Sequence, residues 1–73
     1  MDQINDGDWI IQYSSQTNDY CITRQNYNGF FESDTIDNAL RKINEINNER
    51  KYFPNIFFIN DHGNINQINV TID

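Results

Sequence analysis

The sequence is poor in the residue types that form disulfides and metal sites, with one cysteine and one histidine among 73 residues. Cys21 alone cannot form an internal disulfide, and His62 has no second histidine with which to hold zinc. Acid–base catalysis at His62 and Asp61 needs further convergent ligands or a nucleophile. We therefore predict no catalytic residue, no metal site and no cofactor, and interpret His62 as a turn residue and Cys21 as a small buried hydrophobe.

Long apolar segments are also missing. Uninterrupted apolar runs such as Ile56–Ile59 hold four residues, far below the roughly 20 that cross a bilayer. The chain starts with Asp2, Asp6 and Asp8 in place of the positive start and apolar run of a signal peptide. With 37% hydrophobic residues it can bury a core for one sheet and one helix, but not also enclose a deep substrate pocket. These features predict a cytoplasmic, non-enzymatic protein without a membrane span.

Basic residues are scarce, because five Lys and Arg stand against eleven Asp and Glu, for a formal net charge of −6. An acidic surface repels phosphate backbones and anionic lipids, so neither nucleic acid nor membrane is the expected partner. Thirteen Asn and twelve Ile indicate AT-rich coding, as in a phage or an AT-rich bacterium, yet such coding normally raises the Lys content as well. The scarcity of Lys favours selection for acidity, and a protein with a basic surface as the partner.

Alternating apolar residues predict three strands in the first half of the chain. The first covers Trp9–Ser14, the second Tyr20–Tyr27 and the third Phe30–Ser33. Asn28-Gly29 lies between the second and third strands and is typical of a two-residue type I′ hairpin turn. This turn predicts Tyr27 opposite Phe30 and Asn26 opposite Phe31. One face of the hairpin is then expected to carry Tyr20, Ile22 and Phe31, and the other Tyr27, Phe30 and Glu32.

A helix from about Ile36 to Arg50 is predicted by one apolar stripe after capping residues. Ser33, Asp34 and Thr35 offer N-cap oxygens. The stripe consists of Ile36, Ala39, Leu40, Ile43 and Ile46. A second hairpin follows, from Ile56–Ile59 through a loop with a left-handed Gly63 to Ile65–Ile72.

Together these elements predict one small α+β domain over residues 1–73, with residues 1–7 as a flexible acidic tail. We expect a mostly antiparallel sheet of about five strands in the chain order β-β-β-α-β-β, with the helix packed on one face. One helix covers one face only, yet the other face is also expected to carry apolar groups, from Ile10, Tyr27, Phe30 and alternate residues of Ile56–Ile59. Three alternatives for the cover of this second face are a homodimer, a partner protein, and internal cover by the N-terminal segment or Tyr52-Phe53.

The candidate partner-binding residues are aromatic and acidic side chains around the first hairpin and the helix start: Asp19, Tyr27, Phe30, Glu32, Asp34 and Asp37. Aromatic residues beside charge are typical of binding hot spots, although Tyr27 and Phe30 also fit simple packing on a neighbouring strand. The Asp and Glu residues, together with Asp6 and Asp8, are expected to steer association with a basic surface.

The string Glu32-Ser33-Asp34-Thr35-Ile36-Asp37-Asn38-Ala39-Leu40, preceded by a hairpin, resembles the strand-to-helix junction of the HicB-like antitoxin family. The resemblance covers about 20 residues, and capped amphipathic helices after hairpins recur in many folds. The family's DNA-binding C-terminal extension has no counterpart here, and no functional residue is carried over. The resemblance implies no membership.

The function expected from these features is that of a small acidic inhibitor or antagonist that docks on a basic protein surface, as nucleic-acid mimics, immunity proteins and phage anti-defence proteins do. The alternative is a homodimeric accessory domain whose acidity serves only solubility.

Overall fold

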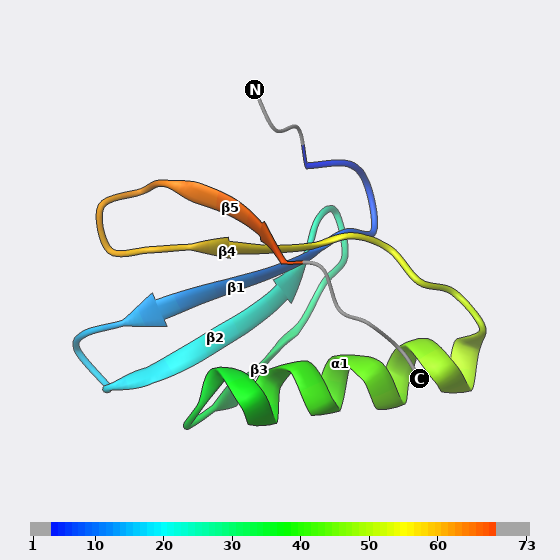
Figure 1. The fold of residues 1–73 in the computed structure, drawn as a ribbon, viewed down its shortest axis with the longest axis horizontal. Helices are drawn as coiled ribbons and strands as arrows, with labels where there is room; N and C mark the ends of the chain where they lie inside the picture. Colours follow the sequence, from blue (N-terminus) through cyan, green and yellow to red (C-terminus); the bar gives the residue numbers. More distant parts are fainter. Residues whose placement is uncertain (1–3, 69–73) are drawn as a thin grey trace.

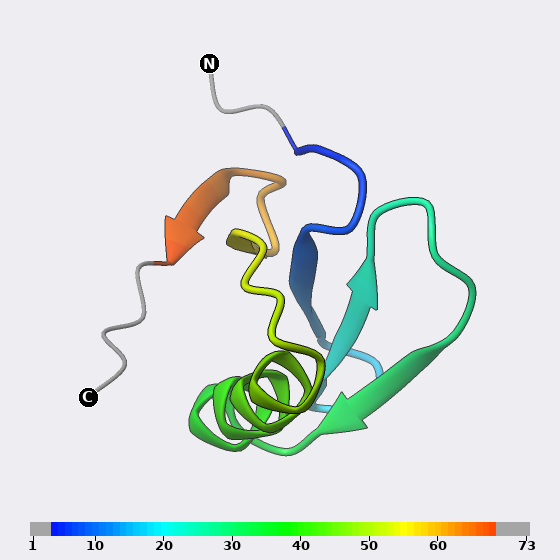
Figure 2. The same cartoon turned by 90° about the vertical axis from the view of Figure 1, so that its right-hand side faces the viewer.

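The computed structural model describes residues 4–68, which form one twisted five-stranded sheet with a helix lying along one face (Figures 1 and 2). The elements in chain order are β1 (Trp9–Ser14), β2 (Asp19–Arg24), β3 (Phe30–Ser33), α1 (Ile36–Arg50), β4 (Ile56–Ile59) and β5 (Ile65–Ile68). The strand order across the sheet is β3-β2-β1-β4-β5. The predicted α+β class, chain order and single helix are confirmed, and residues 69–72 of the last predicted strand lie outside the described part.

The sheet is mixed, because β1 and β4 pair in parallel while the other three pairings are antiparallel. β3 runs in the same direction as β4, so the chain must cross over the sheet between them, and parallel strands are normally joined by such a helical crossover. α1 makes this connection over β2 and β1 (Figure 1).

The core lies between α1 and one sheet face. The cluster of buried residues consists of Trp9, Ile11, Ile22, Ala39, Ile43 and Ile56. The predicted face of Trp9 and Ile11 is therefore the face that the helix covers. Tyr20 and Phe31 pack against the cluster from the same face, as predicted.

α1 has the predicted bounds, and its ends are capped by side-chain and backbone groups. Thr35 is the N-cap, and its Oγ1 accepts a 3.1 Å hydrogen bond from the Asn38 amide. At the other end Lys51 adopts a left-handed conformation with φ 57°, and its amide donates to the Asn47 carbonyl. These caps set the helix between β3 and the segment that leads to β4.

The first hairpin differs from the prediction in its turn and register. Phe31 pairs with Ile22 instead of Asn26, and Phe30 pairs with Thr23 instead of Tyr27. β2 ends at Arg24 because the chain turns there, with the Tyr27 amide donating to the Arg24 carbonyl at 3.2 Å and Asn26 at φ 63°. Asn28 does not adopt the positive φ that a type I′ turn at Asn28-Gly29 requires.

The register shift does not move side chains between faces. Phe31 is displaced along β2 by four residues, from Asn26 to Ile22, and an even shift keeps each side chain on its own face. Phe31 therefore stays with Ile22 on the helix side, and Phe30 and Glu32 stay on the opposite side. Tyr27 lies beyond the end of β2 and is not Phe30's cross-strand neighbour.

Asp6 and Gly7 of the N-terminal segment form hydrogen bonds with the residues that follow β2. Gly7 is buried, and its amide donates to the Gln25 carbonyl at 2.9 Å. The Asp6 carboxylate accepts from the Asn26 side chain. These hydrogen bonds continue the pairing of β1 with β2 beyond the ends of both strands. The polar composition of the segment gives no sign of this pairing.

The sheet surface opposite α1, here called the outer face, carries Ile10, Cys21, Phe30, Glu32, Phe57, Ile59 and Ile65. Phe57, in a central strand, is 2% exposed, and Ile10 and Ile59 are half-buried. The exposed apolar side chains are Phe30 at 67% and Ile65 at 41%, on the two opposite edge strands. Tyr52 and Phe53 are about half exposed.

Candidate functional site

Two carboxylates meet at the β2–β3 edge, where Lys42 of α1 lines the same cavity as Glu32 without forming an ion pair with it in the described part of the chain. Asp19 opens β2, and Glu32 lies on β3 directly opposite Cys21. A side-chain hydrogen bond with Asp19 and the charge of that carboxylate raise the pKa of Glu32 above its ordinary value, with a smaller effect of burial. Within residues 4–68 no Lys or Arg nitrogen lies within 4.0 Å of either carboxylate. We call Asp19 and Glu32 the acidic pair.

Cys21 lies on the outer face, directly opposite Glu32 and two positions after Asp19. Burial raises the pKa of its thiol, and the charges of Glu32 and Asp19 raise it further. These effects favour the protonated thiol over the thiolate, in line with the lack of a basic neighbour in the sequence. The sequence predicts a buried Cys21, but the side chain is only half-buried, because the neighbouring strand β3 is an edge strand.

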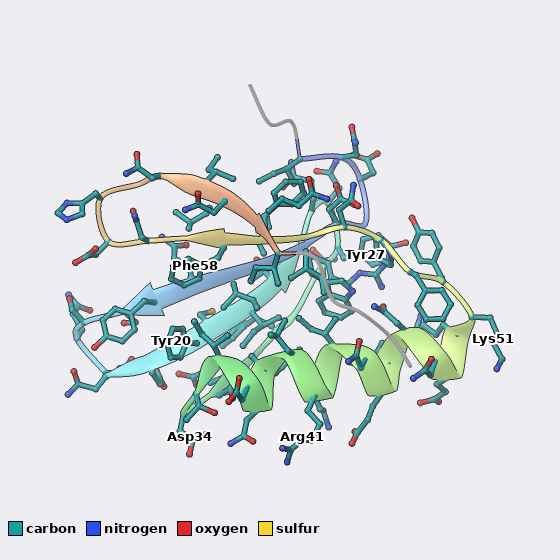
Figure 3. All side chains as sticks on the ribbon, in the orientation of Figure 1. Tyr20, Tyr27, Asp34, Arg41, Lys51 and Phe58 are labelled. Atoms are coloured by element: carbon teal, nitrogen blue, oxygen red, sulfur yellow. The ribbon has the colours of Figure 1, made fainter. Side chains whose placement is uncertain are left out.

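Asp34 and Asp37 extend the acidic region to the start of α1. Both side chains are exposed, and Asp34 accepts a 2.8 Å hydrogen bond from the Asn38 side chain. Asp37 lies in the first helical turn, where the helix dipole favours negative charge. Figure 3 places Asp34 at one end of α1 and Lys51 at the other, so the charges along the helix are polarised.

The two aromatic residues predicted at the hairpin tip do not form a pair. Phe30 lies on the outer face of β3, two positions before Glu32. Tyr27 instead stacks on the guanidinium of Arg24, which lies 4.1 Å from the centroid of its ring. Of the six predicted site residues, the structure thus groups Asp19, Phe30 and Glu32 on one surface and places Asp34 and Asp37 beyond it. Tyr27 lies apart from these acids, and it lines a cavity together with Phe30.

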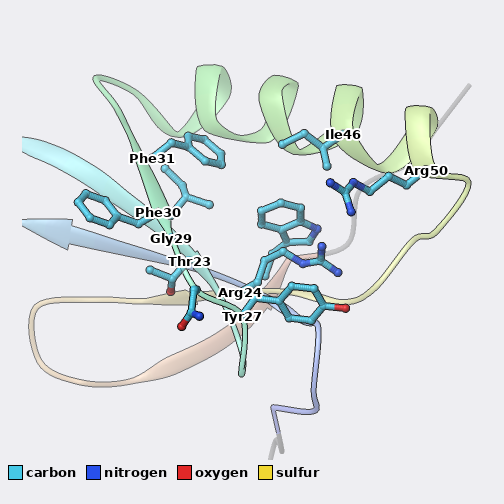
Figure 4. A pocket seen from close by; sticks show the side chains of 11 residues that line it. Thr23, Arg24, Tyr27, Gly29, Phe30, Phe31, Ile46 and Arg50 are labelled. Atoms are coloured by element: carbon cyan, nitrogen blue, oxygen red, sulfur yellow. The ribbon is translucent and has the colours of Figure 1, made fainter.

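Tyr27 belongs to a pocket that sequence reasoning missed. A cavity of about 260 Å³ lies between the segment 24–31 and the C-terminal part of α1 (Figure 4). Aromatic rings and two arginines line it: Trp9, Arg24, Tyr27, Phe30, Phe31 and Arg50. We call it the arginine pocket.

Arg24 is held in this pocket by four contacts. Its Nε donates to the Gly7 carbonyl at 3.0 Å. Its guanidinium carbon lies 4.1, 4.8 and 5.8 Å from the ring centroids of Tyr27, Trp9 and Tyr52. Arg50 reaches toward it from the last turn of α1 (Figure 4). In the described part of the chain, neither guanidinium has a carboxylate within 4.0 Å.

The pocket has one faint signal in the sequence. Arg24 is the only basic residue among the first 40, in a segment otherwise dominated by acids. Arg50 gives no such signal, because a basic residue in the last turn of a helix is already explained by the helix dipole. Their convergence depends on how α1 packs on the sheet, which no local pattern specifies.

Asp8 has a structural role that differs from the expected steering role. The residue is 4% exposed, and its carboxylate accepts hydrogen bonds from the amides of Asn5 and Asn55 at 2.9 and 3.1 Å. It therefore joins the N-terminal segment to the residue that precedes β4. A buried carboxylate with these partners is not available to an approaching surface.

His62 and Asp61 lie in the exposed loop between β4 and β5. Nε2 of His62 is 3.8 Å from the Asp61 carboxylate, and the Asn60 side chain accepts from the amides of His62 and Asn64. Gly63 is left-handed with φ 84°, as predicted for this loop. Within residues 4–68 no group of three or more His, Cys, Asp or Glu side chains is placed to hold a metal ion.

Comparisons with protein-family models, with curated proteins and with solved structures find no significant match to this chain. Over the described residues, no helix combines the length and apolar character that crossing a membrane requires. The candidate surfaces therefore rest on their own geometry: the acidic pair with Phe30 on the outer face, and the arginine pocket at the other end of β3.

Proposed function

We propose that this protein is a non-enzymatic binding module that docks on a basic surface of another protein, as an inhibitor or antagonist of the nucleic-acid-mimic, immunity or phage anti-defence type. The single observation that carries the proposal is the acidic pair. Two carboxylates share one site at the end of the β2–β3 edge, where a side-chain hydrogen bond with Asp19 and then the charge of that carboxylate raise the pKa of Glu32. A cation supplied by a partner relieves the repulsion between the two carboxylates. Binding of a cation at this pair is therefore more favourable than binding at an isolated carboxylate.

Longer-range attraction comes from the acids around this pair. Asp34 and Asp37 are exposed at the start of α1, and the whole chain carries a net charge of −6. Charges of one sign on one region raise the association rate with an oppositely charged surface, and the effect weakens as salt increases. The expected association is therefore fast at low salt and strongly dependent on ionic strength.

Short-range contact is supplied by Phe30. Its side chain is 67% exposed on the same face of β3 as Glu32. Two positions along a strand span roughly 7 Å, so one small partner patch contacts both residues. An exposed aromatic ring next to charge is a common anchor in protein interfaces, because ring burial adds affinity where the charges set orientation.

The test captures partners from a lysate of the source cells with matched charge variants as bait. Glu32→Gln with Asp34→Asn removes two charges at the acidic pair and helix start, while Glu45→Gln with Glu49→Gln removes two charges elsewhere on α1. We expect one basic protein to bind the wild type and the second variant, with the first variant associating about tenfold more slowly at low salt. No specific partner, or equal association of the two variants, contradicts the proposal.

A homodimeric accessory domain is the second candidate, and the outer face is the observation that favours it. Ile10 and Ile59 are half-buried, and Phe30 and Ile65 are exposed at opposite edges of this face. Light scattering from about 5 to 500 μM distinguishes the two functions, because a dimer through this face has a concentration-dependent mass and melting temperature. A constant monomer mass excludes the dimer.

A cytoplasmic setting is part of the proposal. The support is the chain's only cysteine, Cys21, which has no partner for an internal disulfide, and proteins of reducing compartments keep such thiols free. The abundance of Asn and Ile supports an origin in a phage or an AT-rich genome, where small acidic antagonists of host proteins are useful.

A further inference from the structure

The arginine pocket brings two positive charges together in a chain that has few of them. Arg24 from the end of β2 and Arg50 from the last turn of α1 line the same cavity of about 260 Å³. The chain has eleven acidic residues, yet within residues 4–68 none of their carboxylates lies within 4.0 Å of either guanidinium. Two like charges in one cavity repel each other, and an anion between them removes that repulsion.

Arg24 is already held in a fixed orientation. Its Nε donates to the Gly7 carbonyl, and its plane packs against Tyr27 on one side with Trp9 nearby. This single backbone contact leaves the terminal nitrogens of the guanidinium without a hydrogen-bond partner in the described part of the chain. A guanidinium fixed by its neighbours binds an oxyanion at a lower entropy cost than a free side chain does.

One side of the pocket is apolar and largely aromatic, and the rest of its lining includes the polar residues Thr23 and Asn28. Trp9 and Phe31 pack edge to face, with ring centroids 6.3 Å apart, and Ile46 of α1 completes this side (Figure 4). The side formed by Trp9, Phe31 and Ile46 accepts a flat apolar group but provides no hydrogen-bond partner for a polar one. The cavity volume is near the lower end of small-molecule sites, which start at about 300 Å³.

We propose that the arginine pocket binds a small aromatic oxyanion, in which a phosphate or carboxylate is attached to one planar ring. Arg24 and Arg50 hold the oxyanion, and the ring lies against Trp9 and Phe31. Arg24 orients the group through its fixed plane, while the exposed Arg50 adds the second charge from the end of α1.

This site is separate from the acidic pair, and Phe30 is the residue that it shares with the proposed docking surface. The acidic pair lies at the end of the sheet where α1 begins, and the arginine pocket lies where α1 ends (Figure 3). Neither Asp19 nor Glu32 lines the pocket. Loss of protein docking and loss of anion binding are therefore separable by substitution.

The test is an NMR titration that monitors the indole N–H of Trp9, the only tryptophan of the chain. The probes are phenyl phosphate and benzoate as aromatic oxyanions, inorganic phosphate as the oxyanion alone, and phenol as the ring without the charge. Phenyl phosphate, benzoate or both should shift the Trp9 signal saturably, and comparison of the two shows which oxyanion is preferred. Phenol should give no saturable shift, and inorganic phosphate should bind at least about fivefold more weakly than the better aromatic probe.

Matched variants assign the binding to the pocket. Arg50→Gln removes the exposed arginine of the pocket, and Arg41→Gln removes an exposed arginine of the same helix that does not line it. We expect Arg50→Gln to weaken the aromatic oxyanion at least about fivefold and Arg41→Gln to leave it within twofold. Absence of saturable binding by both aromatic oxyanions, equal effects of the two variants, or inorganic phosphate binding as tightly as the better aromatic probe overturns the proposal.

Discussion

The indole nitrogen of Trp9 donates a buried 3.0 Å hydrogen bond to Oδ1 of Asn47, which joins β1 to α1. The Asn47 carbonyl also accepts the amides of Lys51 and Tyr52 where the helix ends. One residue therefore fixes both the angle of the helix against the sheet and the exit of the chain toward β4. Since Trp9 lines the arginine pocket, the same hydrogen bond also holds a wall of that pocket.

Replacement of Asn47 by alanine should lower the free energy of unfolding by about 1–2 kcal/mol. The substitution leaves the buried indole N–H without its partner, and the higher helix propensity of alanine offsets only part of this loss. Asn48→Ala is the matched control, because Asn48 is the exposed neighbour on the same helix. Urea unfolding monitored by Trp9 fluorescence measures both variants, and an Asn47→Ala protein as stable as Asn48→Ala would mean that the hydrogen bond contributes nothing.

This bond illustrates why the fold was easier to predict than the sites. The order of the elements and the bounds of β1, β3, α1 and β4 follow from local patterns, such as the period-two alternation in β1 and the capped apolar stripe in α1. Asn47 follows the apolar stripe, but its polarity hides that it is buried. A buried asparagine is recognised only when its partner is known, and Trp9 is 38 positions away.

The hairpin shows the limit of local turn signals. Asn28-Gly29 is a strong signal for a tight turn, but hydrogen bonds from Gly7 and Asp6 and the stacking of Tyr27 on Arg24 stabilise a wider loop. The hydrogen bonds of Gly7 and Asp6 join segments that are far apart in sequence. The strand faces were still predicted correctly, because the register moved by an even number of residues and the apolar pattern specifies the face.

Gly7 should tolerate alanine less well than Gly63 does. Both glycines have positive φ, 87° and 84°, so alanine costs about 1–2 kcal/mol of backbone strain at either position. At Gly7 an added Cβ also meets Tyr52 Oη at 3.2 Å and Arg24 Nη2 at 3.4 Å, whereas at Gly63 nothing lies within 4 Å. The difference between the unfolding free energies of Gly7→Ala and Gly63→Ala isolates this close approach. Equal losses would mean that Tyr52 and Arg24 move aside freely.

Lys51 offers a site where glycine should stabilise the protein. Its left-handed φ of 57° is unfavourable for a residue with a Cβ, and glycine is the preferred residue just past a helix end. Lys51→Gly should raise the free energy of unfolding by about 0.5–1 kcal/mol. Lys42→Gly, in the middle of α1, should lower it by about 1 kcal/mol. A loss of stability in both variants would contradict the left-handed cap.

The acidic pair predicts an unusual pH dependence of stability. Hydrogen bonding and repulsion between Glu32 and Asp19 raise the pKa of Glu32 in the folded state above its value in the unfolded chain. The folded state therefore binds the proton more tightly, so this contribution to stability is fully present below the ordinary glutamate pKa and is lost as the pH rises through the raised value. Glu32→Gln, which cannot ionise, should melt at a higher temperature than the wild type at pH 7.

The same substitution should lose its advantage in acid, where Glu32 is protonated in the wild type as well. Glu45→Gln is the control for general charge, because it removes one exposed carboxylate from the middle of α1 and leaves the acidic pair intact. Melting curves of the three proteins between about pH 3 and pH 7 test the prediction. If Glu32→Gln and Glu45→Gln change the melting temperature equally at every pH, the effect is due to the net negative charge of the chain and not to repulsion within the acidic pair. The acidic pair would then offer a basic partner no more than any other two exposed carboxylates.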